Sequence, residues 1–242
     1  MSAEFLYGMN TAGEVLSAGR RRVFRLYISR KEKDPRVQGL VGLARKAGVP
    51  VDFCDPRTLE KMTGAVNHQG VVVETEPPGR LDLEGALALV KDPKRTIWAG
   101  LDGITDPMNL GAIIRSAACL GVSVIVLPER RSAGLTPTVQ KAASGAVEKV
   151  DVVEVVNLNR TILRLKEKGF WIYGMDMGGK PLPQADFALP AFVVIGSEGD
   201  GLHEKTREHC DEIVSIPQKG GVASLNASNA AAVVFYELSK KI

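Results

Sequence analysis

The sequence predicts an α/β protein of two domains, because segments with strand and helix patterns alternate along nearly all of its 242 residues. Hydrophobic residues make up 45% of the chain, which is ample for a buried core. The alternation breaks once, at Pro77-Pro78-Gly79 and the polar stretch that follows. We therefore place one domain over residues 1–76, a linker over 77–94 and a second domain over 95–242.

The first domain is predicted to be a small α/β sandwich, because its helix and strand patterns lie between recognisable start and stop signals. Gly48 ends one helical pattern, and Asp55-Pro56 begins another. Helices are expected over 11–18, 35–47 and 57–62, and strands over 23–29, 49–54 and 70–75. The linker is expected to contain one helical piece at 83–90.

The second domain is predicted to contain a mostly parallel sheet, because its strand segments are nearly continuous apolar runs that alternate with helices. Such runs are typical of strands that helices cover on both faces. Strands are expected over 96–101, 122–127, 152–156, 170–175, 192–195 and 213–216. Helices are expected over 110–120, 137–145, 160–168 and 227–238.

Cysteine usage and hydropathy exclude several classes of protein. Cys54, Cys119 and Cys210 lie far apart and form no C-x-x-C pair, which argues against a disulfide framework and a structural zinc site. The first residues lack the features of a signal peptide, and no apolar run reaches membrane-spanning length. We expect a cytoplasmic protein that needs neither a membrane nor a metal ion.

Positive charge is concentrated in the first third of the chain. Residues 1–80 carry 13 basic against 9 acidic side chains, whereas the remainder carries 18 against 19. This excess predicts contact with a phosphate backbone, although a solvated helix end is an equally acceptable interpretation. The residues concerned are Arg20, Arg21, Arg22 and Arg25, followed by Arg30, Lys31 and Lys33.

The first polar cluster that indicates chemistry follows the strand expected at 96–101. Asp-Gly and Asp-Pro turns lead from this strand to Asn109, which we expect to cap the next helix, and to Arg115 within that helix. Open α/β sheets bind ligands at the carboxyl ends of their strands, where these side chains are predicted to lie. The alternative is an ordinary capped helix with a surface arginine.

The second cluster, residues 196–202, follows the strand expected at 192–195. Its three glycines allow close approach of a ligand to the backbone, whereas its two acids do not favour phosphate. The order G-x-x-G-x-G differs from the dinucleotide fingerprint G-x-G-x-x-G, so a Rossmann oxidoreductase is weakly supported. The alternative is a surface turn.

The third cluster begins at Ile216, the end of an apolar strand, and continues through two glycines to Ser224, Leu225 and Asn226. The two glycines free the backbone, and Ser and Asn side chains lie at the start of a helix as hydrogen-bond donors. Together these features predict a site for a polar small molecule. Ser224 is expected to cap the last helix, whose small residues also predict tight packing.

Together, the three clusters resemble in order and spacing the three motifs of the SpoU branch of the SPOUT RNA methyltransferases. With Tyr7-Gly8 and Asn67-His68-Gln69-Gly70, the whole chain is most similar to the bacterial 23S rRNA guanosine 2′-O-methyltransferases that act on the peptidyl-transferase loop. The three matching motifs are Asn109-x5-Arg115, Gly196-Ser-Glu198-Gly-x-Gly201 and Ile216-Pro-x5-Ala-Ser224-Leu-Asn226-x-Ser228.

The resemblance implies an architecture that periodicity alone does not predict, since true knots are rare among folds. It implies an L30e-like, ribosomal-protein-like N-terminal domain that binds substrate RNA, and a catalytic domain with a deep trefoil knot. It also implies that S-adenosylmethionine lies bent against the knot loops and that a homodimer completes each active site.

The resemblance also assigns roles to individual residues. Cofactor binding is expected from Gly196, Ser197, Glu198, Gly199, Gly201, Ile216, Ser224 and Leu225. The expected catalytic set is Asn109, Arg115, Glu198, Ser224 and Asn226. RNA contacts are expected from a mobile segment at 8–10, including Asn10, and from Arg20, Arg21, Arg22, Arg25 and Arg115. His68 is expected to be packed or hydrogen-bonded and not catalytic.

Arg115 resembles the arginine that is sometimes assigned as the general base in this family. A guanidinium is nearly always protonated and has no acceptor, so we expect Arg115 to grip the target phosphate instead. Proton loss would then be assisted by that phosphate, by water or by an acid such as Glu198.

The sequence is also compatible with two other functions. A tRNA 2′-O-methyltransferase of the same branch shares the chemistry, but such enzymes typically carry short terminal extensions in place of the N-terminal domain. A noncatalytic RNA-binding protein in ribosome assembly would share the fold, but the complete polar set of the three motifs argues against it.

Overall fold

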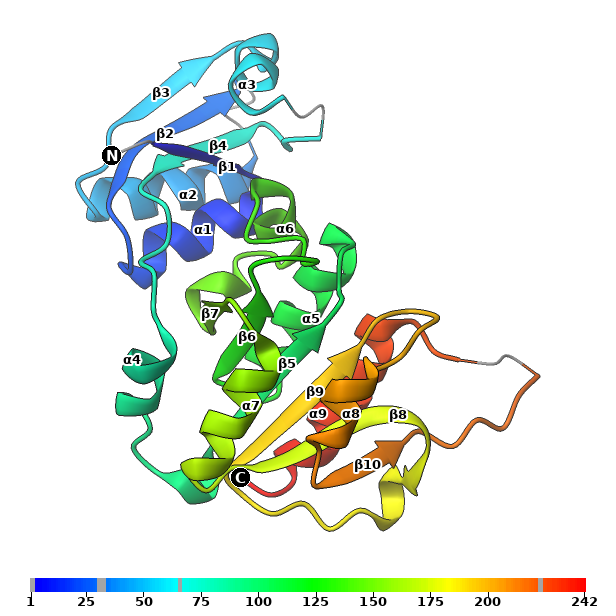
Figure 1. Cartoon of the computed structure of the whole chain (residues 1–242). Helices are drawn as coiled ribbons and strands as arrows, with labels where there is room; N and C mark the ends of the chain where they lie inside the picture. Colours follow the sequence, from blue (N-terminus) through cyan, green and yellow to red (C-terminus); the bar gives the residue numbers. More distant parts are fainter. Residues whose placement is uncertain (1–2, 30–33, 65–66, 222–223) are drawn as a thin grey trace. The chain divides into compact units, whose positions relative to one another are not determined.

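The computed structural model describes residues 3–29, 34–64, 67–221 and 224–242 (Figure 1). The chain divides into two compact units. Unit 1 contains residues 1–79 and 135–149, and unit 2 contains residues 80–134 and 150–242. Residues 135–149 fall inside the predicted second domain, yet they pack in unit 1. The predicted basic residues Arg30, Lys31 and Lys33 lie outside the described residues.

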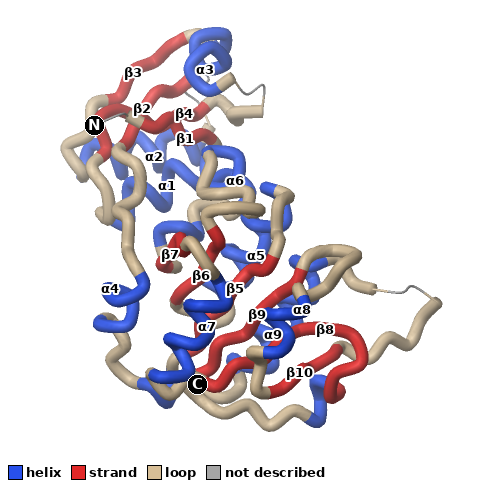
Figure 2. Tube along the Cα trace, viewed as in Figure 1, coloured by secondary structure: helices blue, strands red, loops and turns tan. Residues whose placement is uncertain are grey.

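Unit 1 is built on a four-stranded sheet, which Figure 2 shows in red. Its strands lie in the order β1-β4-β2-β3, with β2 and β3 parallel and the other pairs antiparallel. These strands are β1 (Glu4–Tyr7), β2 (Val23–Ser29), β3 (Val51–Cys54) and β4 (Val71–Thr75). The helices are α1 (Met9–Ala18), α2 (Pro35–Lys46) and α3 (Pro56–Thr63), together with α6 (Pro137–Ala142) and the 3₁₀ turn η2 (Ala146–Glu148).

Two apolar clusters hold this sheet. Helices α1 and α2 bury residues such as Val15 and Leu40 against Leu26 and Val73, while Leu59 of α3 packs in a separate cluster. The predicted helices and strands are present with small shifts at their ends, and β1 is an additional strand. Gly8 precedes α1, which begins at Met9 and includes Asn10, and the Gly8 N–H donates to the Val71 carbonyl at 3.1 Å.

A buried charged cluster joins β1 and the start of β2 to residues 137–148. Arg21 forms ion pairs with Glu4, at 3.4 Å, and with Glu148, and its Nη2 donates to Gln140 Oε1 at 3.2 Å. Gln140 Nε2 in turn donates to Glu4 Oε1 at 2.5 Å. The Arg21 side chain is only 2% exposed. The prediction that Arg21 contacts RNA is therefore wrong, because its guanidinium faces carboxylates inside unit 1.

This cluster predicts an unusual pH dependence, because burial raises the pKa of Glu4 although Arg21 lowers it. A carboxyl whose pKa is raised by folding binds more protons in the native state, so its contribution to stability falls as pH rises from about 4 through the folded pKa. We expect Glu4→Gln to gain stability relative to the unchanged protein between pH 4 and pH 7. Urea unfolding at several pH values measures this difference, and a difference that is constant or falls with pH would contradict the assignment.

Unit 2 contains a six-stranded sheet in the order β10-β8-β9-β5-β6-β7, and every neighbouring pair is parallel. The predicted α/β class with a mostly parallel sheet is therefore confirmed. The strands are β5 (Ile97–Asp102), β6 (Val124–Pro128), β7 (Asp151–Val155), β8 (Trp171–Pro181), β9 (Ala191–Gly196) and β10 (Glu212–Ser215). The chain proceeds outward from β5 through β6 to β7, whereas β9, β8 and β10 lie on the other side of β5.

Helices cover both faces of this sheet (Figure 1). Helices α4 and α7 bury residues such as Ala86 and Ile162 against Trp98 and Val126, and α5 packs against α9 on the opposite face. These helices are α4 (Leu83–Ala88), α5 (Pro107–Cys119), α7 (Leu158–Glu167), α8 (Glu204–Glu208) and α9 (Ala227–Ser239), with 3₁₀ turns η1 (Pro93–Arg95) and η3 (Leu182–Gln184). Among the described residues, no helix combines the length and apolar character needed to cross a membrane.

Strand β8 is longer than the sequence predicts, because it continues past the apolar run through a polar and glycine-rich segment. Gly179 allows this extension beside β10, since a Cβ at that position would lie 2.5 Å from the Ile213 carbonyl oxygen. The register between β8 and β10 also shifts after Ile213. The extension matters because it brings residues 176–178 to the edge of the candidate site.

Candidate active site

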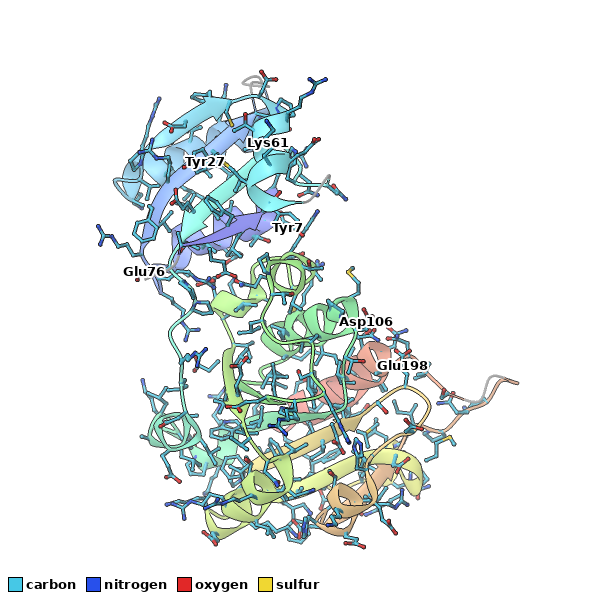
Figure 3. All side chains as sticks on the ribbon, turned by 45° about the horizontal axis from the view of Figure 1, so that its top comes forward. Tyr7, Tyr27, Lys61, Glu76, Asp106 and Glu198 are labelled. Atoms are coloured by element: carbon cyan, nitrogen blue, oxygen red, sulfur yellow. The ribbon has the colours of Figure 1, made fainter. Side chains whose placement is uncertain are left out.

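The three predicted motifs meet at the carboxyl ends of β5 and β9, where the strand order changes direction. Glu198, in the loop after β9, accepts hydrogen bonds from Asn109 Nδ2 at 2.7 Å, from the Ala227 N–H at 3.2 Å and from Asn226 Nδ2. Asn226 Nδ2 also donates to Asn109 Oδ1 at 3.0 Å. Figure 3 labels Glu198 and also Asp106, the residue that precedes α5. Residues far apart in sequence thus form one polar network at the point where open α/β sheets bind ligands.

The helix caps that position this network differ from the predicted ones. Asp106, not Asn109, caps α5, since its carboxylate accepts from the Met108 N–H at 3.1 Å and the Asn109 N–H at 3.2 Å. A proline at the first helical position is typical after such a cap, so the Asp-Pro pair was the signal for this assignment. The amide of Asn109 is therefore available to Glu198.

The cap of the last helix, α9, also differs from the predicted one. Asn226, not Ser224, caps α9, because its Oδ1 accepts from the Ser228 N–H at 2.9 Å and the Asn229 N–H at 3.4 Å. Its Nδ2 donates to Glu198 and Asn109, so one amide both begins the helix and fixes the network. The negative charge of Glu198 lies at the positive end of α9, where the helix dipole stabilises an anion.

A cavity of about 620 Å³ adjoins the network. It lies within the size range of small-molecule and cofactor sites. Additional walls come from residues that the sequence interpretation missed, Met175, Asp176, Met177 and Gly178 at the extension of β8. The glycine-rich run after an apolar strand was the signal for them. All eight predicted cofactor residues line it: Gly196, Ser197, Glu198, Gly199, Gly201, Ile216, Ser224 and Leu225.

The glycines of the loop after β9 allow the loop itself to form a tight turn. Ser197 and Gly201 exchange backbone hydrogen bonds of 3.0 and 3.2 Å, and Gly199 and Gly201 have φ of 94° and 68°. A Cβ on Gly196 would lie 2.3 Å from the backbone of Gly201. The close approach predicted at Gly196 is therefore made by Gly201, and it fixes the loop that carries Glu198.

The chemistry of the cavity walls fits S-adenosylmethionine. Ile195, Ile216 and Leu225 offer apolar surface for a purine ring, and Ser197 and Ser224 are hydroxyl donors and acceptors. Asp176, Glu198 and Asp200 are acidic, and carboxylates attract a sulfonium cation. Arg207 pairs with Asp176 and anchors that side of the wall.

Arg115 is the remaining residue of the predicted catalytic set. It is exposed on α5, six residues after Asn109, which corresponds to about 9 Å along a helix. This position suits a role on a large substrate that reaches the site from solvent.

The remaining RNA candidates lie in unit 1. Asn10 and Arg22 are exposed, and Arg22 lies over the Phe24 ring at 5.3 Å. Arg20 Nη1 donates to the Glu148 carbonyl at 3.3 Å, and Arg25 pairs with Asp52 at 2.5 Å. His68 is buried and its Nδ1 accepts from the Gly70 N–H, so the prediction of a structural histidine is confirmed.

A cofactor-sized cavity beside a fixed carboxylate, at the switch point of a parallel sheet, defines an α/β enzyme that binds a nucleoside-like cofactor. Comparison with known proteins gives the family. The SpoU rRNA Methylase family matches residues 97–236, and a family described as RNA 2′-O ribose methyltransferase substrate binding matches residues 5–81. The chain belongs to the SpoU family of RNA 2′-O-methyltransferases, and the family resemblance of the motifs is confirmed.

Individual relatives agree with this assignment. The chain is 38% identical over 98% of its length to the 23S rRNA (guanosine-2′-O-)-methyltransferase RlmB of Pseudomonas aeruginosa, and it covers 96% of that protein. It is 42% identical to an uncharacterized tRNA/rRNA methyltransferase of Synechocystis, of whose length it spans 62%. Its fold matches the SpoU methyltransferase AviRb of Streptomyces viridochromogenes in complex with AdoMet, with a TM-score of 0.81, 25% identity and coverage of 98% of this chain and 90% of that one. The predicted cofactor, S-adenosylmethionine, is thereby confirmed.

Proposed function

We propose that this enzyme transfers a methyl group from S-adenosylmethionine to the ribose 2′-hydroxyl of a guanosine in the peptidyl-transferase loop of 23S rRNA. The similarity to RlmB proteins along nearly their whole length supports the substrate. The observation that carries the chemistry is the network of Asn109, Glu198 and Asn226 on the wall of a cofactor-sized cavity.

The cavity of about 620 Å³ is the proposed cofactor site. The turn over residues 196–201 and the side chains of Ile216, Ser224 and Leu225 would hold the cofactor, which supplies an electrophilic methyl group when bound. Transfer requires the attacking oxygen, the methyl carbon and the sulfur to lie nearly in line, so the protein's main task is positioning. Glu198 performs part of this task, because it locks the starts of α5 and α9 through Asn109 and the Ala227 N–H.

Proton removal from the 2′-hydroxyl needs an acceptor, and the described residues of the network offer one. Glu198 Oε1 takes the donors described above, whereas no hydrogen bond to its Oε2 exists among the described residues. We assign Glu198 as an orienting group that also provides an acceptor at the cavity wall. Ser224 is assigned to the cofactor side of the same wall.

Arg115 is assigned to the target phosphate and not to proton removal, since a guanidinium donates hydrogen bonds and accepts none. We expect Arg115→Ala to lower kcat/KM for rRNA by about 100-fold, because the ribose loses its fixed position. Arg115→Lys should keep the charge, lose the bidentate geometry and show an intermediate loss. Nearly full methylation by the lysine variant, with an unchanged pH-rate profile, would contradict the role.

The finer architecture is part of the same proposal. We assign residues 1–76 to an L30e-like domain that positions rRNA through Asn10, Arg20, Arg22 and Arg25, and we assign the catalytic domain with a deep trefoil knot to unit 2, which also contains most of the predicted linker. The family resemblance supports this division. We also propose a cytoplasmic homodimer, a state that the exposed Met108, Val233 and Tyr236 on α5 and α9 favour.

Transfer of radiolabelled methyl groups to unmethylated 23S rRNA, followed by nucleotide mapping, tests the proposed function. Label is expected on one guanosine ribose of the peptidyl-transferase loop, with unmethylated tRNA as the control substrate. Label on tRNA would favour the tRNA enzyme of the same branch, and label on a base nitrogen would contradict 2′-O-methylation. RNA binding without any transfer would favour the noncatalytic assembly protein.

A further inference from the structure

A second cavity, of about 400 Å³, opens at the carboxyl ends of β5, β6 and β7 in unit 2. Its walls include Arg130 and Arg131 after β6, Asn159 after β7, and His203 and Lys205 after β9. None of these residues belongs to the three motifs. The cavity is therefore a separate feature of the sheet edge at which the proposed cofactor site lies.

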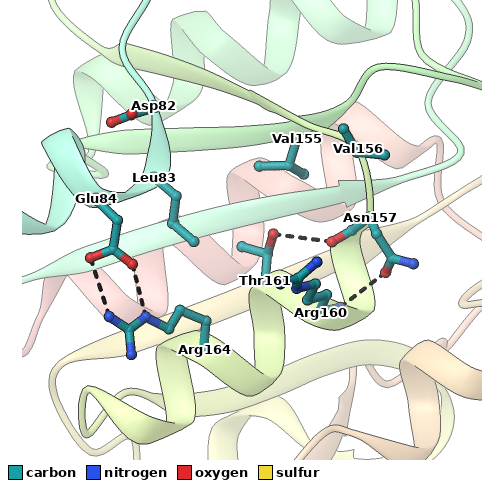
Figure 4. A pocket seen from close by; sticks show the side chains of 9 residues that line it. All are labelled: Asp82, Leu83, Glu84, Val155, Val156, Asn157, Arg160, Thr161 and Arg164. Atoms are coloured by element: carbon teal, nitrogen blue, oxygen red, sulfur yellow. Dashed lines mark hydrogen bonds and ion pairs between the residues drawn. The ribbon is translucent and has the colours of Figure 1, made fainter.

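A neighbouring cavity of about 580 Å³ extends this surface, because both cavities share Val156 and Asn157 (Figure 4). On its far side lie Arg160 and Arg164 of α7. Val156, directly after β7, is 81% exposed and offers an apolar surface in this cavity. We call the two cavities together the β7 groove, which runs from Arg130 past Val156 to Arg164.

The charge of the β7 groove is unevenly compensated. In the described part of the chain, Arg130, Arg131, Lys205 and Arg160 form no ion pair. Three of the four carboxylates that line the groove already have other partners. Asp102 pairs with His203 at 2.8 Å, Asp82 accepts from the Gly85 N–H at 2.7 Å, and Glu84 pairs with Arg164 at 2.8 Å. Glu204 is the carboxylate that remains to oppose these cations. Uncompensated cations along a groove are the electrostatic footprint of a polyanion site.

Two polar atoms at this edge also lack partners. In the part of the chain that the structure describes, Ser132 Oγ and Asn159 Oδ1 are buried and have no hydrogen-bond partner. Buried polar groups are nearly always satisfied, so such atoms indicate a bound water or ligand nearby. RNA is distinguished from DNA by a ribose hydroxyl that both donates and accepts, and hydroxyl and amide side chains are suitable partners for it.

The β7 groove and the proposed cofactor cavity are adjacent along the sheet edge. The loop after β9 lines both, with Ser197 on the first cavity and His203 on the groove, and Gly103 lies against both side chains. Strands β9 and β7 are separated by three strand spacings, which is about 14 Å. One strand of RNA is long enough to contact both sites within a few nucleotides.

We propose that the β7 groove binds the sugar-phosphate backbone of single-stranded rRNA beside the target nucleotide. Arg130, Arg131 and Lys205 contact one phosphate region, Arg160 contacts the next, and exposed Val156 lies against a base between them. This proposal rests on the proposed function for its substrate. It adds an RNA contact in unit 2 to the contacts proposed for unit 1.

The test compares two groove variants, Arg130→Gln/Arg131→Gln and Arg160→Gln, with Arg95→Gln as the matched control. Arg95 is also an exposed arginine of unit 2, but it precedes β5 and so lies at the opposite edge of the sheet. Affinity for an rRNA fragment is measured by fluorescence anisotropy over a range of salt concentrations. KM and kcat for methylation and calorimetric S-adenosylmethionine affinity are measured in parallel.

We expect the double variant to lose about tenfold in rRNA affinity. Its slope of log affinity against log salt should fall by about 0.7 for each phosphate contact removed. KM for rRNA rises accordingly, while kcat, cofactor affinity and the Arg95→Gln control are unchanged.

An unchanged salt slope and KM in both groove variants would overturn the proposal, as would an equal effect in Arg95→Gln. Loss of cofactor affinity in the groove variants would also overturn it, since the groove would then act through the cofactor cavity. A protein that binds the fragment with the expected slopes but never methylates it would refute the proposed function alone.

Discussion

Glu198→Ala is expected to lower kcat/KM for rRNA methylation by about 100-fold or more. Alanine removes the acceptor of three donors, the amides of Asn109 and Asn226 and the Ala227 N–H. The starts of α5 and α9 then lose the carboxylate that fixes them beside the cavity, and displacements of about 1 Å in an active site have losses of this size. Radiolabelled methyl transfer under single-turnover conditions measures the chemical step directly.

Glu198→Gln separates charge from geometry. Its carbonyl oxygen still accepts, but neutral hydrogen bonds are about half as strong as charge-assisted ones, so we expect a smaller loss, about tenfold. Glu208→Gln is the matched control, because Glu208 is an exposed carboxylate at the end of α8 and makes no ion pair in the described residues. Activity of Glu198→Ala close to that of this control would refute the role assigned to the network.

The parallel sheet of unit 2 was predictable from sequence because its strands are continuous apolar runs separated by amphipathic helices. The ends of the elements were less predictable. The β8 extension through Gly178 and Gly179 depends on pairing with β10, a contact between distant residues that no local pattern contains. Strand β1 was missed for the same reason, since its four residues are recognisable only by their pairing with β4.

The residues of the candidate site were predictable because three motifs occur in a known order, whereas their hydrogen bonds were not. Capping was assigned to Asn109 and Ser224, yet Asp106 and Asn226 perform it, because a cap depends on where the helix begins. The role predicted for Arg21 was wrong for a different reason. It lies in a run of arginines typical of an RNA-binding surface, but its burial depends on residues 137–148, more than a hundred positions away.

Arg21→Met is expected to lower the free energy of unfolding by about 3–5 kcal/mol. Methionine nearly matches the apolar stem of arginine but leaves Glu4 and Glu148 in the interior without their cation. An uncompensated buried charge has a far larger cost than the loss of a surface pair. Urea unfolding measures the change, and hydrogen exchange over residues 137–148 should show that this segment loosens first.

Arg36→Met is the matched control, because the Arg36 side chain is 77% exposed and its pair with Asp34, at 3.1 Å, should contribute less than about 1 kcal/mol. A further variant, Arg21→Met with Glu4→Gln and Glu148→Gln, tests the mechanism, since neutral amides remove the unpaired charges. It should recover a substantial part of the lost stability. If the triple variant is no more stable than Arg21→Met, the cost arises from packing and hydrogen-bond geometry, and the buried charge is not its cause.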